Sequence, residues 1–338
     1  MKKVRVEDAV GLVLAHDITR IVPGQSKDVP FRRGKVIEKG DVERLLDLGK
    51  SHIYATDGFE REVHEDDAAR RIAAAAIDGN MELTPAREGR INIVSRISGL
   101  VAVDRRRLDE INRIKDVLFT VVPDKYPVKP GDIVAATRIV PLYIPESLLQ
   151  QAEAVGRKGP VRILPFTAMS VGLVVTGTEV ATGRIQDASG RVEAKLAGYG
   201  LEIKGKRIVP DDVNAIRDAI MELMAAGSQL IVTTGGLSVD PDDLTKEGIE
   251  ATGARIISYG APVFPGAMFL AARLKGRYIL GAPACVYFNA RTMLDILLPR
   301  IMAGLRVTAS GVRKMALGGL CLHCDVCRYP TCFFGKGE

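Results

Sequence analysis

The feature that most constrains the fold is an alternation of apolar runs and helical patterns between residues 168 and 305. The apolar runs have the length of buried strands, and the segments between them have helical spacing and stop at glycines. This alternation predicts an α/β domain in which helices flank a parallel sheet. We expect its strands at residues 170–177, 202–209, 228–236, 254–260 and 276–283, and a long closing helix at 285–304.

The rest of the chain predicts smaller units. A strand or hairpin arm is expected at residues 31–37, followed by a short helix that Asp41 caps. A second helix begins at His64, where an exposed side chain is expected. We therefore divide the chain into an N-terminal α+β, mostly β, module, a mixed α/β middle region, the α/β domain and a cysteine-rich tail, over residues 1–60, 61–165, 166–306 and 307–338.

Composition excludes several classes of protein. Hydrophobic residues make up 47% of the chain and charged residues 26%, which is ordinary for a folded domain. No apolar run reaches the roughly 20 residues that span a bilayer. The net charge of +6 is scattered, without a nucleic-acid-binding motif. We expect a cytoplasmic protein that binds neither membrane nor nucleic acid.

Polar and glycine residues follow the predicted strands, where ligands of parallel sheets bind. Glycines let backbone amides approach a ligand, threonine and serine hydroxyls both donate and accept, and clustered aspartates can hold Mg²⁺. Asp243, with Asp242 as its nearest rival, is the candidate for a catalytic or metal-contacting group. The candidate ligand-binding residues are Thr176, Gly177, Thr178, Glu179, Thr234, Gly235, Gly236, Ser238, Asp240, Pro265 and Gly266.

Two of these segments resemble a known family. VVTGTEVATG and IVTTGGLSVDPDDLT are similar to the molybdopterin-binding domain shared by molybdopterin adenylyltransferases and molybdopterin molybdotransferases. The resemblance covers about 140 residues. It implies molybdopterin or its adenylylated form as ligand, glycines around the phosphate, and Asp243 at the functional centre. It also implies a homo-oligomer and, as partners, molybdoenzymes or cofactor-assembly proteins.

Two segments depart from the molybdotransferase pattern. A Pro-Gly-Lys-Pro segment is usual where this chain reads Pro265-Gly266-Ala267-Met268, and Pro-Gly-Asn-Pro where it reads Gly281-Ala282-Pro283-Ala284. The lysine and the asparagine are both missing. The resemblance therefore supports binding of the pterin better than insertion of the metal, and either transferase activity remains open.

The tail has the spacing C-x2-C-x2-C-x4-C, formed by Cys321, Cys324, Cys327 and Cys332. Four closely spaced thiolates can bind tetrahedral zinc or an iron–sulfur cluster. The leading CxxCxxC favours a [4Fe–4S] cluster over Zn²⁺, and His323 could replace one thiolate. Cys285 opens an apolar segment and is expected to be buried packing.

Three functions follow from these patterns. The first is a molybdopterin-binding protein that takes part in biosynthesis or delivery of the molybdenum cofactor. The second is a metal-dependent hydrolase that cleaves the pyrophosphate of a nucleotide such as ADP-ribose. The third is a non-catalytic cofactor-binding protein that senses redox state through its cysteines.

Overall fold

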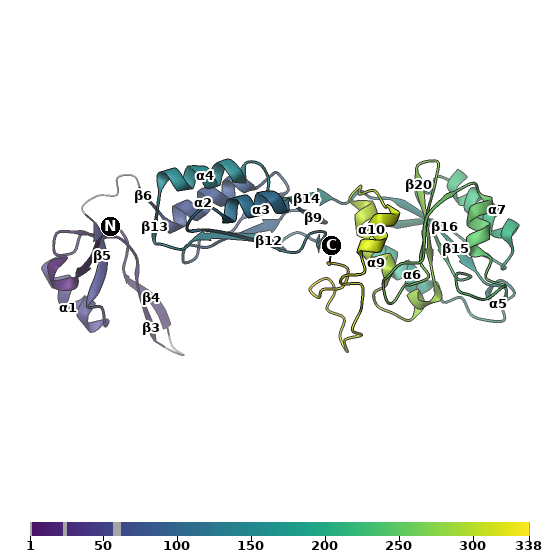
Figure 1. Ribbon diagram of the computed structural model, residues 1–338. Coiled ribbons are helices and arrows are strands. Elements are labelled where there is room, and N and C mark those ends of the chain that lie inside the picture. Colours follow the sequence, from purple (N-terminus) through teal and green to yellow (C-terminus); the bar gives the residue numbers. More distant parts are fainter. Residues whose placement is uncertain (1, 23–25, 57–61, 338) are drawn as a thin grey trace.

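The computed structural model describes residues 2–22, 26–56 and 62–337. The molecule is elongated, with the N-terminal module at one end and the α/β domain at the other (Figure 1). The C-terminal tail lies beside the α/β domain, on the side toward the middle region. Within the described ranges, no helix combines the length and apolar character needed to cross a membrane.

The N-terminal module encloses its own small core. Its strands form a three-stranded sheet of order β1-β5-β2 and a hairpin of β3 and β4. The predicted boundary near residue 60 lies outside the described residues. The elements are β1 (Lys2–Arg5), η1 (Val6–Asp8), β2 (Val13–Leu14), β3 (Ile18–Val22), β4 (Ser26–Phe31), α1 (Lys39–Asp47) and β5 (His52–Thr56).

Two local expectations for this module were wrong. The segment at 31–37 is not a strand, because the chain turns after Phe31 and only Val36 forms a bridge, to Val13. Asp41 is not the N-cap of α1. The helix begins at Lys39, two residues before Asp41, and its N-cap is Glu38. The Asp41 carboxylate instead accepts a hydrogen bond from the Glu38 N–H at 3.0 Å, which completes a capping box from inside the helix.

The middle region packs three helices on a four-stranded antiparallel sheet of order β10-β12-β8-β7 (Figure 1). Arg71 on α2 binds Glu146 and Glu153, both on α4, and so links two of these helices. The elements are β6 (Glu62–His64), α2 (Glu65–Ala76), β7 (Met81–Leu83), β8 (Ile91–Ser95), β9 (Gly99–Val103), α3 (Arg105–Asn112), β10 (Val117–Val121), β11 (Pro127–Val128), β12 (Ile133–Ile139), β13 (Tyr143–Pro145), α4 (Glu146–Gly156) and β14 (Val161–Pro165).

His64 is buried, so the expectation of an exposed side chain was wrong. Its Nδ1 accepts a hydrogen bond from the Asp66 N–H at 3.3 Å and thereby caps α2. Strand β13 pairs with β6 and brings the Tyr143 ring to 5.2 Å from the imidazole. Burial, together with the Arg33 cation, lowers the pKa of the His64 imidazole.

The contribution of His64 to stability is therefore expected to fall as the pH is lowered below about 6.5. The pKa of unfolded histidine is about 6.5, so neutral His64 stabilises the fold above that pH, and this contribution is lost as the pH falls through the lower folded-state pKa. His64→Asn keeps an N-cap acceptor without titrating, so its urea midpoint should change less over this range. His52→Asn, on an exposed side chain, is the control. Identical pH dependence of His64→Asn and the wild type would contradict this account.

The α/β domain contains a six-stranded sheet that confirms the predicted fold class. Strands β16, β15, β17 and β20 are parallel to one another. Strands β15 and β17 are buried along their whole length, as their continuous apolar runs require. In spatial order the strands are β16 (Glu202–Val209), β15 (Ser170–Thr176), β17 (Leu230–Thr234), β20 (Arg277–Ala282), β19 (Leu270–Leu274) and β18 (Arg255–Tyr259).

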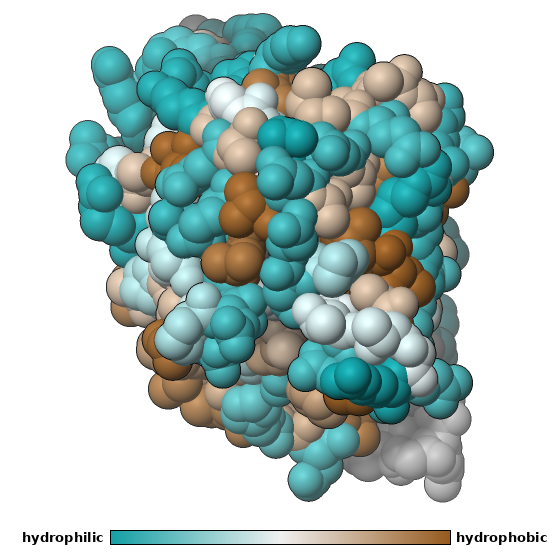
Figure 2. All heavy atoms as spheres, turned by 90° about the vertical axis from the view of Figure 1, so that its right-hand side faces the viewer, coloured by the Kyte–Doolittle hydropathy of each residue, from teal (hydrophilic) through white to brown (hydrophobic). Residues whose placement is uncertain are grey.

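Helices cover both faces of this sheet (Figure 1). One face packs against α6, α9 and α10, and the other against α7 and α8. Seen from this end of the molecule, the surface is largely hydrophilic, with apolar side chains in separate groups (Figure 2). The helices are α5 (Thr178–Ala181), α6 (Gly190–Gly198), α7 (Val213–Ala225), α8 (Thr245–Ala251), η2 (Ala284–Tyr287), α9 (Met293–Met302) and α10 (Ala309–Lys314).

Two features of this domain differ from the expectation. Strand β19 was not predicted, and it makes the sheet mixed because it runs antiparallel to both neighbours. It joins β20 through Lys275 and Gly276, whose positive φ angles suit a tight hairpin turn. The closing helix at 285–304 is interrupted, because Thr292 and Asp295 form a capping box that starts α9 at Met293.

Candidate functional site

The two glycine-bearing turns leave the sheet at the same edge. Strands β15 and β17 are parallel neighbours, with Val175 opposite Thr234, so the turns that follow them lie side by side. The last residue of β20, Ala282, lies opposite Thr234 on the other side. The topology thus brings together the residues that sequence analysis selected at the ends of the first and third strands of the domain.

Buried hydroxyl groups hold these turns together. Thr176 Oγ1 donates to the Thr234 carbonyl at 3.1 Å and lies 2.8 Å from Thr245 Oγ1. Thr245 Oγ1 donates to the Gly235 carbonyl at 3.0 Å, and Tyr287 Oη donates to Thr234 Oγ1 at 2.7 Å. The hydroxyls of the candidates Thr176 and Thr234 therefore have structural partners. Thr245 and Tyr287 were missed because only the folded chain brings them to this edge.

Gly235 and Gly236 allow the two turns to come into contact. Their φ angles are +93° and +54°. A Cβ on Gly235 would lie 2.3 Å from the Thr176 carbonyl oxygen, and one on Gly236 would lie 2.5 Å from Thr245 Oγ1. Both the backbone conformation and the close approach of the chain thus require glycine here.

Asp211 is a site residue that sequence analysis missed. It follows β16 and accepts a hydrogen bond from the Thr178 N–H through Oδ2 at 2.8 Å. Its Oδ1 is buried and has no hydrogen-bond partner among the described residues. A Cβ on Gly236 would lie 3.1 Å from this Oδ1, so the free oxygen borders the glycine turn. The position of Asp211 after a predicted strand was the available signal.

The predicted aspartate cluster forms a compact loop. Asp243 is half-buried, and its Oδ2 accepts a hydrogen bond from the Ser238 N–H at 2.7 Å. Asp240 Oδ1 accepts from the Asp242 N–H at 3.0 Å, and both of these aspartates are exposed. Within the described part of the chain, no three His, Cys, Asp or Glu side chains are placed to hold a metal ion. The Mg²⁺ assignment therefore gains no support from this geometry.

Pro265 and Gly266 lie against the start of α9. The Pro265 carbonyl accepts a hydrogen bond from the Met293 N–H at 3.2 Å. A Cβ on Gly266 would lie 2.7 Å from Met293 Cβ, so close packing explains this glycine. Glu179, in the first turn, is exposed.

A charged group acts electrostatically on Tyr287. Lys206 on β16 binds the carboxylates of Asp187 and Glu193, the latter at 2.8 Å. Burial raises the pKa of the Asp187 carboxyl, but hydrogen bonds from Lys206 and Ser189 outweigh it, so the net pKa is lowered. Burial also raises the pKa of Tyr287, on which Asp187 and Lys206 act electrostatically. These charges can therefore influence a ligand bound near Tyr287.

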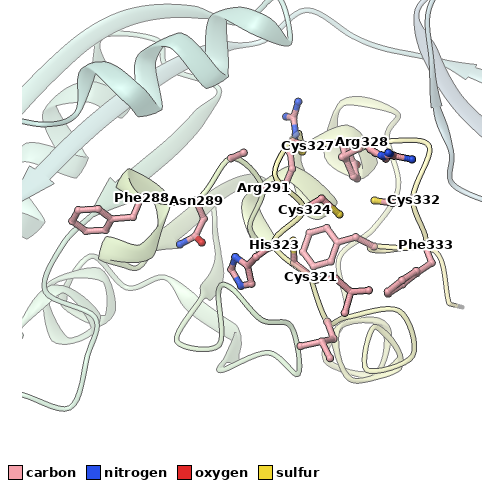
Figure 3. Close-up of a pocket in the computed structure, with 15 residues that line it drawn as sticks. Phe288, Asn289, Arg291, Cys321, His323, Cys324, Cys327, Arg328, Cys332 and Phe333 are labelled. Carbon is pink, nitrogen blue, oxygen red and sulfur yellow. The ribbon is translucent and has the colours of Figure 1, made fainter.

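The four tail cysteines line a separate cavity of about 200 Å³ next to residues 288–291 (Figure 3). Cys324 and Cys327 are exposed, whereas Cys321 and Cys332 are half-buried. All four thiols are free. Cys285 is half-buried, and burial raises the pKa of its thiol, which agrees with a packing role.

Two parts of the chain match family models. Residues 172–303 match the family described as probable molybdopterin binding domain. Residues 3–57 match a family described as a domain of unknown function. The resemblance inferred from the sequence motifs is thus confirmed for the α/β domain, and the C-terminal cysteines lie beyond the matched residues.

The curated relatives are similar over a short stretch. A CinA-like protein of Mycobacterium avium is 42% identical over 85 residues, which are 25% of this chain and 19% of the relative. A CinA-like protein of a Mycobacterium species is 45% identical over 75 residues, which are 22% of this chain and 18% of the relative. This chain therefore spans about a fifth of the length of the relatives it matches.

Solved structures similar to the domain share little sequence with it. The molybdopterin biosynthesis enzyme MoaB from Thermus thermophilus is 20% identical, with a TM-score of 0.31, and covers 40% of this chain and 97% of its own. The tungsten cofactor synthesizing protein MoaB from Pyrococcus furiosus is also 20% identical, with a TM-score of 0.33. Its match covers 40% of this chain and 93% of the MoaB chain.

Proposed function

We propose that the chain binds molybdopterin where β15 and β17 end, within the residues 172–303 that match the family described as probable molybdopterin binding domain. Glycine-bearing turns hold anions through their backbone amides. In the turns at 176–179 and 234–238, the phosphate would be held by amides other than those of Gly177, Thr178 and Ser238, which already donate within the protein. The pterin would lie against the polar groups beside them. The ligand-binding candidates retained from the sequence are Thr176, Gly177, Thr178, Glu179, Thr234, Gly235, Gly236, Ser238, Asp240, Pro265 and Gly266.

The observation that carries this proposal is the free oxygen of Asp211. A buried carboxylate oxygen without a donor is costly, and a pterin ring presents N–H groups that could satisfy it. The oxygen borders Gly236, where no side chain intervenes. Asp211 thus offers ring recognition at the place where the turns offer amides. Asp243 and Asp242 remain the candidates for a direct role in chemistry.

The proposal extends to a role in biosynthesis or delivery of the molybdenum cofactor. Binding of the pterin or its adenylylated form has more support than insertion of the metal, because the chain has Ala267 at the family's lysine position and Pro283 at its asparagine position. Molybdoenzymes or assembly proteins as partners, a homo-oligomer and a cytoplasmic location belong to the same proposal. The clustering of four of the five cysteines supports that location.

Two inorganic cofactors are proposed on sequence grounds. Mg²⁺ would bind near Asp240, Asp242 and Asp243, although loop N–H groups already use two of their oxygens. The tail cysteines would bind a [4Fe–4S] cluster in preference to Zn²⁺, and their spacing is the support for this.

Anaerobic titration of the full chain with molybdopterin tests the main proposal. We expect saturable binding that Asp211→Asn weakens about tenfold or more, since a hydrogen bond to a charged group is worth ~1.5–3 kcal/mol. Asp243→Asn should also weaken binding. Asp218→Asn, on the exposed face of α7, should bind like the wild type.

Absence of saturable binding to the folded wild type would overturn the proposal. So would equal affinities of Asp211→Asn and Asp218→Asn, because the site would then lie elsewhere. Mg²⁺-dependent hydrolysis of ADP-ribose, without binding of molybdopterin, would favour the pyrophosphatase-like alternative instead.

A further inference from the structure

The cysteine tail forms a loop whose two ends are fixed to the α/β domain. At one end, Cys321 N–H donates to the Phe264 carbonyl and Phe264 N–H to the Gly319 carbonyl, both at 2.8 Å. At the other end, the Phe334 ring is only 2% exposed, and Gly335 N–H donates to the Gly318 carbonyl at 2.9 Å. The four cysteines therefore lie on a closed loop, so part of the entropy cost of bringing them together is already met.

This loop lies next to residues 287–291, a segment that also contacts the proposed molybdopterin site at the end of β17. Phe288 and Arg291 line the cysteine cavity (Figure 3), and Tyr287, just before them, donates its hydroxyl to Thr234. Two side chains of α6 hold the segment, because Arg191 donates to the Tyr287 carbonyl at 2.7 Å and Lys195 to the Ala290 carbonyl at 2.9 Å. The cysteine cavity is thus built onto a well-anchored part of the domain.

The charges beneath the cavity do not balance. Asp295 is fully buried and pairs with two cations, Lys195 at 2.7 Å and Arg291 at 2.9 Å. Arg291 also lies beside the Cys327 thiol, and its Nε is buried without a hydrogen-bond partner among the described residues. Two cations against one carboxylate leave an excess positive charge next to the thiols.

A second cation lies at the other end of the cysteine loop. Lys336 contacts the Cys332 carbonyl through its ammonium, which also lies 5.5 Å from the Tyr329 ring centre. Burial lowers the pKa of this ammonium, whereas Cys332 acts to raise it. A metal held by four thiolates carries a net negative charge, which is the charge that these two cations can stabilise.

We infer that Cys321, Cys324, Cys327 and Cys332 form a binding site for a thiophilic metal centre, zinc or an iron–sulfur cluster, with Arg291 as its counter-cation. The inference rests on the proposal that these cysteines bind metal, and it adds the place of the centre and the residue that balances its charge. In the described structure the thiols do not yet form a ligand set. Residues 322–331 have no helix or strand, so local adjustment of the loop can bring the thiols together.

The test uses the full chain, reconstituted anaerobically with ferrous iron and sulfide in one arm and with Zn²⁺ in the other. Metal and sulfide are measured per chain, with absorption spectra. We expect a bound centre that Cys324→Ser and Cys327→Ser lose and Cys285→Ser keeps. Iron with sulfide would identify a cluster, and zinc alone a zinc site; either supports the inference. A folded wild-type chain that binds neither would overturn it.

Arg291 is tested as a positioning residue by charge. Arg291→Met should weaken metal binding about tenfold, and for a bound cluster it should also lower the reduction potential, because a positive charge favours the reduced form. Arg291→Lys should restore both properties, while Arg313→Met, on an exposed side chain of α10, should leave them unchanged. If Arg291→Met and Arg313→Met have the same metal affinity and reduction potential, Arg291 is not the counter-cation. Because metal content is measured without molybdopterin, failure here is separate from failure of pterin binding.

Discussion

Replacing Asp295 with alanine is expected to destabilise the α/β domain by about 3–5 kcal/mol, because it removes a fully buried carboxylate and leaves two partly buried cations without their partner. Asp295 is fully buried, and it binds Lys195, Arg291 and the Thr292 N–H. The substitution therefore also removes the capping box that starts α9. Asp295→Asn retains an acceptor for the cap, so it should fall between the wild type and alanine.

Urea denaturation of the full chain measures the loss of stability. Native-state hydrogen exchange of the α9 amides shows whether this loss lies within the domain. Glu222→Ala is the matched control, because it also breaks an ion pair, with Arg207, but on an exposed surface. It should change stability little, since exposed ion pairs contribute little. Equal exchange rates in Asp295→Ala and Glu222→Ala would show that the buried charge group does not hold α9.

Gly235→Ala is expected to destabilise the domain by about 2–5 kcal/mol. Part of the cost is the positive φ, roughly 1–2 kcal/mol for a residue with a Cβ. The rest is steric, because the new Cβ would lie 2.3 Å from the Thr176 carbonyl oxygen, and such overpacking costs roughly 1–3 kcal/mol. The same displacement would separate the two turns, so binding of molybdopterin should fall as well.

Two other glycines separate these contributions. Gly253 has a φ of +81° but no atom near its added Cβ, so Gly253→Ala should show the conformational cost alone. Gly198 lies in α6 with open space and ordinary φ, so Gly198→Ala should be neutral or stabilising by up to about 1 kcal/mol. If Gly235→Ala and Gly253→Ala lower the free energy of unfolding equally, the two turns do not approach each other this closely in solution.

The sequence was sufficient for those parts of the fold that depend on local pattern. The buried strands β15 and β17 were predicted from their apolar runs, and the rule for parallel sheets placed both following turns at one edge. Strand β19 was missed because its sequence, LAARL, is short. Its pairing with β20 depends on the hairpin that joins the two strands. The break before α9 was missed because the apolar pattern runs across Thr292.

The candidate site was harder to predict, since its contacts join distant segments. Asp211 follows Pro210 and precedes a helix, so in the sequence it looks like part of an ordinary helix start. Its role depends on the pairing of β16 with β15, which brings it to Thr178. The partners of the cysteines were hidden in the same way, because Arg291 and Phe264 reach the tail only after the sheet and α9 have formed.

The parallel bridge between Phe264 and Leu320 also decides how this domain can be shortened for laboratory work. Val312, Met315 and Phe334 pack into the same core as strands β15 and β17. A recombinant fragment that stops at residue 306 would expose that apolar surface to water and would invite aggregation. The shortest fragment suited to biophysical study should therefore extend to Gly337, and its handling must exclude air because Cys324 and Cys327 are exposed.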